Sequence, residues 1–323
     1  MATETDANAV KDAVPAGEAA IERAGMDRRG FLRTLGAAGA CALTAGRAAA
    51  APAGPDEEPF GVLVDTTRCV GCRTCERVCA EAHGLPAPDE SDEVMKVARR
   101  PSERQLTVVS RYQTGAGEVF VKRQCMHCLL PACASACLTR AMSKTPEGPV
   151  IWRESKCMGC RFCMISCPFE VPRFEYHSPV PRIVKCSLCW DRLKAGQRPA
   201  CVENCPAEAL VFGRRSQLIE EAQRRIQGSP EAYVHQIYGE REVGGTSYLY
   251  LAAVPFDQLG FRTDLGDSAY PLLTREFLYG VPVVLTLLPA LLLAISNATK
   301  ENQDPSDREA THDRNDAHTG HRA

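Results

Sequence analysis

The longest hydrophobic segment of the chain runs from Phe277 to Ile295 and contains no charged residue. A helix needs about 20 predominantly apolar residues to cross the hydrocarbon core of a bilayer. Pro282 and Pro289 interrupt the segment, but proline is tolerated in membrane helices. The pattern therefore predicts one transmembrane anchor over residues 271–298. A buried helix of a soluble protein is the alternative, because the segment is near the lower limit of spanning length.

Shorter hydrophobic patterns predict a mixed α+β fold. Residues 150–152, 210–213 and 244–251 are rich in β-branched and aromatic residues and are bounded by turn residues, which is typical of short strands. Over residues 216–226, apolar residues recur at helical spacing, which predicts a helix that packs on a core.

Near the N-terminus, Arg28 and Arg29 precede a mildly apolar stretch and then a run of small residues that ends at Ala53. This order is typical of a twin-arginine export signal. It predicts a signal region over residues 1–55, with 26–53 as the signal proper. The body of the protein would then lie in the periplasm, anchored in the inner membrane. The alternative is a chance arginine pair ahead of an alanine-rich amphipathic helix.

The composition is ordinary for a globular protein except for cysteine. The net charge is only -2, so no basic field attracts nucleic acid. Cysteine, however, accounts for 17 of 323 residues. That density indicates disulfides, zinc sites or iron-sulfur clusters.

Sixteen of the cysteines form four blocks, and Cys41 lies in the predicted signal. The blocks are Cys69, Cys72, Cys75 and Cys79; Cys125, Cys128, Cys133 and Cys137; Cys157, Cys160, Cys163 and Cys167; and Cys186, Cys189, Cys201 and Cys205. Three closely spaced cysteines can surround three corners of a cubane, and the fourth ligates a neighbouring cluster. Gly71 and Gly159 can supply the tight turns that such loops need.

Two other uses of these cysteines have to be weighed. Zinc binds through two pairs of cysteines and has no use for a third cysteine two residues further on. Disulfides are common in exported proteins, but the twin-arginine route carries folded proteins whose cofactors are already assembled. The spacing and the signal together favour iron-sulfur clusters over disulfides and zinc.

With these motifs, the chain resembles the four-cluster, ferredoxin-like electron-transfer subunits of periplasm-facing respiratory complexes. It is most similar to the iron-sulfur subunits of membrane-bound uptake hydrogenases, the HybA-like group, through DTTRCVGC at 65–72, QCMHC at 124–128 and CRFCM at 160–164. The segment KCSLCWDR at 185–192 is equally similar to the beta subunits of formate dehydrogenases.

The resemblance implies four [4Fe-4S] clusters, each held by a quartet of cysteines. The first quartet is Cys69, Cys72, Cys75 and Cys205; the second is Cys79, Cys186, Cys189 and Cys201; the third is Cys125, Cys128, Cys133 and Cys167; the fourth is Cys137, Cys157, Cys160 and Cys163.

The resemblance also implies a domain plan and partners. The plan is a ferredoxin-like body over 56–215, with an inner two-cluster unit at 115–170 and an outer, pseudo-symmetric one formed by 56–114 and 171–215, then an extension over 216–270, the anchor, and a polar tail over 299–323. The expected partners are a catalytic hydrogenase subunit and a quinone-reactive integral membrane subunit. A formate dehydrogenase or related molybdopterin oxidoreductase is the alternative complex.

No haem, dinucleotide, phosphate-loop or hydrolase motif occurs, so no catalytic residue is predicted and conduction of electrons is the expected role. Residues 115–200 contain 13 Lys and Arg against 6 Asp and Glu, an excess that could serve anionic clusters. Arg123, Lys156, Arg161 and Lys185 lie closest in sequence to the cysteines. Phe162 is predicted to lie in the core.

Overall fold

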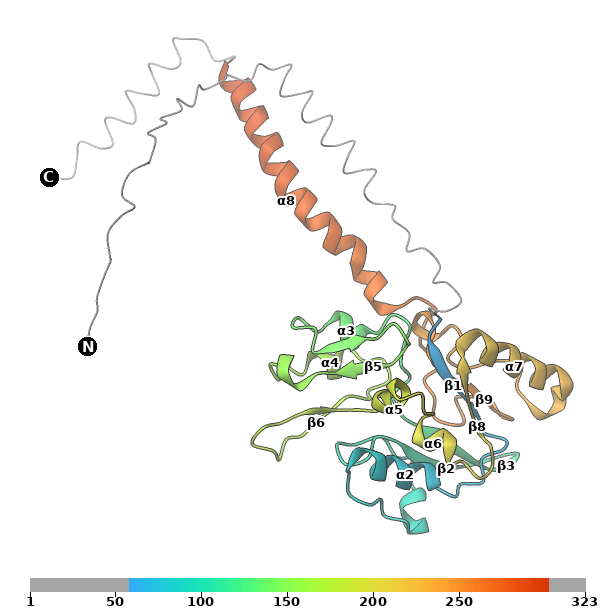
Figure 1. Ribbon diagram of the computed structural model, residues 1–323. Coiled ribbons are helices and arrows are strands. Elements are labelled where there is room, and N and C mark those ends of the chain that lie inside the picture. Colours follow the sequence, from blue (N-terminus) through green and yellow to red (C-terminus); the bar gives the residue numbers. More distant parts are fainter. Residues whose placement is uncertain (1–57, 302–323) are drawn as a thin grey trace, which may run out of the picture. The chain divides into compact units, whose positions relative to one another are not determined.

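The computed structural model describes residues 58–301, and most of its helices and strands are short (Figure 1). The predicted signal region and residues 302–323 of the predicted tail lie outside the described residues. The strands are β1 (Phe60–Asp65), β2 (Val108–Thr114), β3 (Gly117–Arg123), β4 (Met142–Lys144), β5 (Val150–Trp152), β6 (Arg173–Phe174), β7 (Ile183–Val184), β8 (Leu210–Arg214) and β9 (Tyr248–Leu251). The α-helices are α2 (Thr74–His83), α3 (Ala132–Ser135), α4 (Phe162–Ile165), α5 (Trp190–Lys194), α6 (Ala200–Glu203), α7 (Arg215–Gly228) and α8 (Tyr270–Glu301). Short 3-10 turns occur at Asp92–Met95, Glu154–Lys156, Pro230–Ala232 and Glu242–Gly244.

An antiparallel hairpin separates each cysteine block from the next. Strands β2 and β3 lie between the first and second blocks, β4 and β5 between the second and third, and β6 and β7 between the third and fourth. Strand β1 precedes the first block and pairs antiparallel with β8, which follows the fourth. The mixed α+β fold expected from the sequence is confirmed, with each cysteine loop held between hairpin strands.

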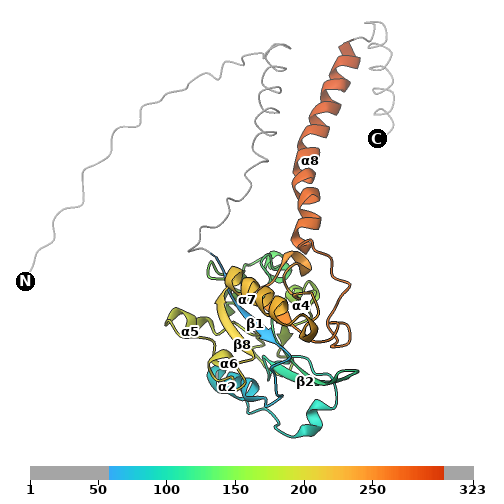
Figure 2. The same cartoon turned by 90° about the vertical axis from the view of Figure 1, so that its right-hand side faces the viewer.

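The largest sheet has the strand order β8-β1-β9, and α7 covers one of its faces (Figure 2). Leu218 and Ala222 of α7 are buried against Leu63 of β1 and Leu249 of β9. The helix predicted over 216–226 is therefore confirmed. The strand predicted over 244–251 begins only at Tyr248, because the two glycines at 244 and 245 have φ of 82° and 89° and form a turn.

Helix α8 is the one described helix that is long and apolar enough to cross a membrane. Its most apolar window has a mean hydropathy of 2.3, and none of that window is buried. A core helix of a soluble protein would bury part of this surface. The exposed surface therefore favours the predicted transmembrane anchor over the buried helix. The helix is longer than the predicted anchor. The prediction ends where the apolar run gives way to polar residues, whereas the helical backbone continues beyond that point.

Candidate iron-sulfur cluster sites

The thiols that the resemblance assigns to the first quartet line one cavity. Cys69, Cys72 and Cys75 come from the loop before α2 and from α2 itself, and Cys205 follows α6. Helix α2 packs on α6, which explains how residues so distant in sequence meet. Burial raises the pKa of Cys69, and the neighbouring Cys205 and Cys72 raise it further. The cavity is thus a pocket of four thiols, as one cluster requires.

In each of the other three quartets, the thiols lie close enough to one another to raise one another's pKa. In the second quartet, burial raises the pKa of Cys79, as do its neighbours Cys186, Cys201 and Cys189. In the third, burial raises the pKa of Cys128 well above its ordinary value, as do Cys125, Cys167 and Cys133. In the fourth, burial raises the pKa of Cys163 to about 11, as do Cys137, Cys157 and Cys160. The structure thus brings the four thiols of each of these quartets together, and their role as cluster ligands stays a prediction.

This arrangement suits cubane clusters better than zinc or disulfides. All sixteen cysteines of the blocks are free thiols. Within residues 58–301, no three His, Cys, Asp or Glu side chains converge closely enough to hold one metal ion. A tetrahedral zinc site needs such convergence, with sulfur at about 2.3 Å from the metal. In a cubane each thiolate ligates a different iron, so its four thiols stand further apart. The residues present therefore fit [4Fe-4S] clusters.

The quartets follow one another in a line through the body. Cys75 of the first quartet has Cys201 of the second as a neighbour that raises its pKa, after burial and a lowering by Lys122. In the same way, Cys125 of the third quartet is a neighbour that raises the pKa of Cys186 in the second quartet. Cys133 of the third similarly has Cys163 of the fourth. Helix α4, at one end of this line, lies in the half of the body from which α8 extends, and α2, at the other end, lies far from α8 (Figures 1 and 2).

Each cysteine loop contains a left-handed residue directly before its second cysteine. These residues are Gly71, His127, Gly159 and Leu188, with φ of 69°, 48°, 72° and 56°. The sequence indicated only the two glycines. His127 and Leu188 hold the same strained conformation because both are fully buried and anchored. The Nδ1 atom of His127 accepts a hydrogen bond of 2.8 Å from the backbone N–H of Val150, and the backbone N–H of Leu188 donates to Sγ of Cys186 at 3.4 Å.

We expect Gly71→Ala to destabilise the protein more than Gly84→Ala does. Both glycines have left-handed φ, so a side chain costs about 1–2 kcal/mol at either position. A Cβ at Gly71 would also lie 2.5 Å from the ring of Phe120, whereas one at Gly84 would meet nothing within 4 Å. Overpacking adds about 1–3 kcal/mol at Gly71. Thermal unfolding of both variants measures the difference, and equal midpoints would show that the contact with Phe120 is unimportant.

Two buried lysines and one half-buried lysine lie among the thiols, and the sequence pointed to only one of them. Of the four cationic residues closest in sequence to the cysteines, Lys185 is buried, Lys156 and Arg161 are exposed, and Arg123 is half-buried. Lys122 and Lys144 are the two that the sequence missed. The ammonium group of Lys144 donates to the carbonyls of Cys128 and Gly148 at 2.8 Å, and that of Lys185 to the carbonyl of Cys186 at 2.9 Å.

None of these three ammonium groups has a carboxylate partner among residues 58–301. The lysine ion pairs in this part of the chain join Lys96 to Glu93 and Lys194 to Asp191, and both are exposed. Buried charges are normally paired. The buried ammonium groups of Lys122 and Lys185, which lie among thiols and have no carboxylate partner in this part of the chain, therefore suit anionic groups at the thiol sites.

The prediction that Phe162 lies in the core is wrong, because the side chain is 54% exposed. It belongs to an apolar patch around the fourth quartet that also contains Leu130, Leu138 and Ile165. Part of this patch continues into a groove between the α3–α4 region and the first turns of α8. The groove is lined by Leu130, Leu138, Phe162, Leu272, Leu278 and Tyr279, among others. Apolar surface of this kind is typical of contacts with another protein or a membrane.

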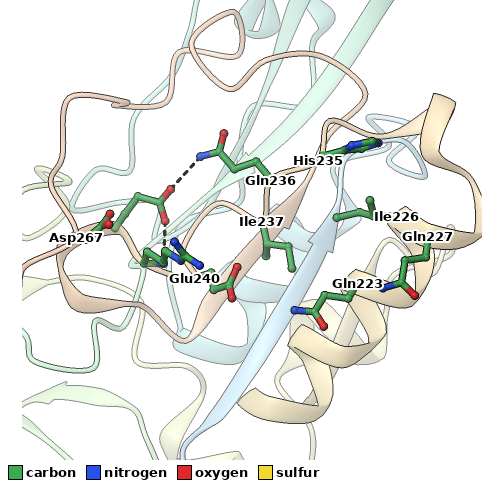
Figure 3. Close-up of a pocket in the computed structure, with 10 residues that line it drawn as sticks. Gln223, Ile226, Gln227, His235, Gln236, Ile237, Glu240 and Asp267 are labelled. Atoms are coloured by element: carbon green, nitrogen blue, oxygen red, sulfur yellow. Dashed lines mark hydrogen bonds between the residues drawn. The ribbon is translucent and has the colours of Figure 1, made fainter.

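A second, polar pocket lies away from the thiols, between α7 and the segment 235–242 (Figure 3). No cysteine lines it. Glu242 is buried at its edge, where its carboxylate accepts hydrogen bonds from the backbone N–H of Gly239 at 2.6 Å and from the side chain of Gln236 at 3.3 Å. These bonds hold the loop together, so Glu242 has a structural role.

Comparison with known proteins agrees with this geometry. A family model described as a 4Fe-4S dicluster domain matches residues 117–215. A protein of Nitratidesulfovibrio vulgaris strain Hildenborough is 46% identical over 289 residues, which cover 86% of this chain and 78% of that protein. The hydrogenase-2 operon protein HybA of Escherichia coli O157:H7 is 32% identical over 321 residues, covering 86% of this chain and 97% of the relative. The iron-sulfur subunit of the nitrate-inducible formate dehydrogenase of Escherichia coli K12 is 33% identical over 199 residues, covering 58% of this chain and 66% of that subunit.

Proposed function

Since the chain belongs to the family of the hydrogenase-2 operon protein HybA, we propose that it is the electron-transfer iron-sulfur subunit of a membrane-bound hydrogenase. It has no catalytic residue of its own in this proposal and connects a catalytic subunit to a quinone-reactive membrane subunit. The observation that carries the proposal is the line of four thiol quartets through the body. Such a line suits conduction, because electrons move between neighbouring redox centres.

The chain's own residues hold and separate the four [4Fe-4S] clusters. When bound, the clusters supply one-electron redox chemistry. Helices α2 and α6 carry ligands of the outer two-cluster unit, and α3 and α4 carry ligands of the inner unit. The backbone N–H of Met142 donates to Sγ of Cys137 at 3.3 Å, and the hydroxyl of Thr139 lies 3.7 Å from the same sulfur. Hydrogen bonds of this kind tune cluster potentials.

The two ends of the line face different partners in this proposal. Cys72 in the first quartet and Cys160 in the fourth are the two exposed cysteines among the sixteen. The apolar patch lies beside the fourth quartet and shares its groove with the first turns of α8, the expected membrane anchor. The fourth quartet therefore faces the membrane subunit, and the first faces the catalytic subunit.

The proposed location is the periplasmic side of the inner membrane. It is supported by the arginine pair at residues 28 and 29, by α8, and by the relationship to HybA. A formate dehydrogenase or related molybdopterin oxidoreductase is the second candidate, supported by the match to the formate dehydrogenase iron-sulfur subunit.

Affinity capture of the full chain from solubilised membranes tests the function. We expect a nickel-containing subunit to co-purify and the captured complex to reduce a quinone with hydrogen. A molybdenum-containing partner would replace hydrogenase by the second candidate. A chain that captures neither metal enzyme would contradict the proposal.

Charged substitutions in the apolar patch test its contact with the membrane subunit. We expect the double variant Leu138→Asp, Ile165→Asp to lose most of its co-purifying membrane subunit, because both side chains are more than 80% exposed and buried carboxylates are costly. The catalytic subunit should still co-purify. Val97→Asp is the control, since Val97 is 72% exposed and is not part of the patch. Full recovery of the membrane subunit would place its docking surface elsewhere.

A further inference from the structure

Lys122 is a buried cation that lies beside thiols and forms no ion pair with a carboxylate among residues 58–301. It lies on β3, is 2% exposed, and lines the cavity formed by the four thiols of the first quartet. Its ammonium group donates one hydrogen bond of 2.7 Å, to Oε1 of Gln124. A buried charge without an opposite charge is strongly unfavourable, so the fold must supply an anion next to Lys122.

Lys122 lies among the ligand thiols of two quartets. It lines one cavity with Cys75 and the other three thiols of the first quartet. Val121, the residue before it on β3, packs in the same core cluster as Cys201 of the second quartet. Clusters held by these two quartets would supply the negative charge that the buried ammonium group needs.

Tyr248 contributes a second polar group at the same place. The side chain is fully buried, and its ring lies 5.4 Å from the ammonium group of Lys122. It packs in the same core cluster as Cys201.

The hydroxyl of Tyr248 has no hydrogen-bond partner in the described structure. Tyr250, two residues further along β9, shows what is normally expected, because its hydroxyl donates to the carbonyl of Lys122 at 2.9 Å and accepts from Gln124 at 2.7 Å. Leaving a buried hydroxyl unpaired costs about 1–3 kcal/mol. The unpaired O–H of Tyr248, which packs in one core cluster with Cys201, therefore indicates an acceptor held by the second quartet.

We propose that Lys122 and Tyr248 set the reduction potentials of the clusters in the first two quartets. This inference rests on the proposed function. The Lys122 ammonium is the shared counter-charge of both clusters, and the Tyr248 hydroxyl donates a hydrogen bond to the cluster of the second quartet. Reduction adds one negative charge to an anionic cluster, so a nearby cation and a nearby donor both favour the reduced form. Both residues therefore raise the potentials, and neither takes part in the chemistry of the catalytic partner.

Redox titration of the purified full chain, followed by electron paramagnetic resonance, tests the proposal. At the wild-type midpoint of the affected clusters, Lys122→Met should lower the ratio of reduced to oxidised cluster about tenfold, a shift of about 59 mV to lower potential for one electron. Lys122→Arg keeps the charge and should recover most of this shift. Lys156→Met is the matched control, because Lys156 is next to Cys157 in sequence but exposed. The cluster reduction potentials of this variant should remain those of the wild type.

Tyr248→Phe provides a test that does not depend on replacing a buried charge. It removes one hydroxyl that has no protein partner, so the variant should fold and keep its full iron content. One cluster should shift to lower potential, and the coupling of an exchangeable proton to that cluster should disappear from its hyperfine spectrum.

The outcomes separate this proposal from the proposed function. Wild-type potentials in both Lys122→Met and Tyr248→Phe, with full iron content, would overturn the proposal and leave electron transfer intact. If Lys122→Met does not assemble clusters, Tyr248→Phe decides the matter alone. A wild-type chain without any cluster signal would instead overturn the proposed function.

Discussion

Replacing Cys201 by serine is expected to interrupt electron flow and to lower the hydrogen-to-quinone activity of the complex by more than about tenfold. Cys201 lies on α6, is buried, and belongs to the second quartet. It is the neighbour of Cys75 in the first quartet, while Cys186 of its own quartet neighbours Cys125 in the third. Because the quartets form a line, the second cannot be bypassed.

Two measurements make this prediction specific. Hydrogen-dependent reduction of an artificial dye by the catalytic subunit should persist, since the dye accepts electrons before the line begins. Cys41→Ser is the control, because Cys41 is the one cysteine outside the four blocks, and it should leave quinone reduction unchanged. Undiminished quinone reduction in Cys201→Ser would show that the second quartet is not part of the path.

Two arginines in the middle of α8 are expected to release the protein from the membrane. On insertion scales an arginine at the centre of a membrane helix costs about 2.5–3.5 kcal/mol. The double variant Leu285→Arg, Leu288→Arg should therefore lose about 5–7 kcal/mol of insertion free energy. Neither leucine is buried against the body, so no protein contact offsets this loss.

Carbonate extraction of membranes measures the effect on α8. The double variant should move to the soluble fraction, and quinone reduction should fall with it. Thr299→Arg is the control, because a long cationic side chain near a helix end can reach the interface. Retention of the double variant in the membrane would mean that α8 is not the anchor.

The features predicted correctly from the sequence are those that depend on local spacing. The cysteine blocks follow from the short intervals that a cluster loop needs, two to four residues everywhere except the eleven between Cys189 and Cys201, and α7 follows from apolar residues one turn apart. The strand at 150–152 was likewise found from a short apolar run after a turn. Such signals survive because every residue that produces them lies in the same loop, helix or strand.

The features missed depend on contacts between distant segments. Lys122 is not among the cationic residues noted from the sequence, and only the fold places it in one cavity with Cys75 and places Val121, its neighbour on β3, in one core cluster with Cys201. Tyr248 reaches the second quartet because β9 pairs in parallel with β1. Phe162 was misplaced for the opposite reason: an aromatic residue between ligands suggests a core, but this one lies on a surface that we assign to a partner.

The central claim, that the four quartets hold [4Fe-4S] clusters, is tested most directly by measuring iron and acid-labile sulfide in the purified full chain. Four cubanes predict about sixteen iron atoms and about sixteen sulfides per chain, together with a signal that appears on reduction. A folded chain with no labile sulfide, whose cysteines are oxidised in pairs or bound to zinc, would contradict it.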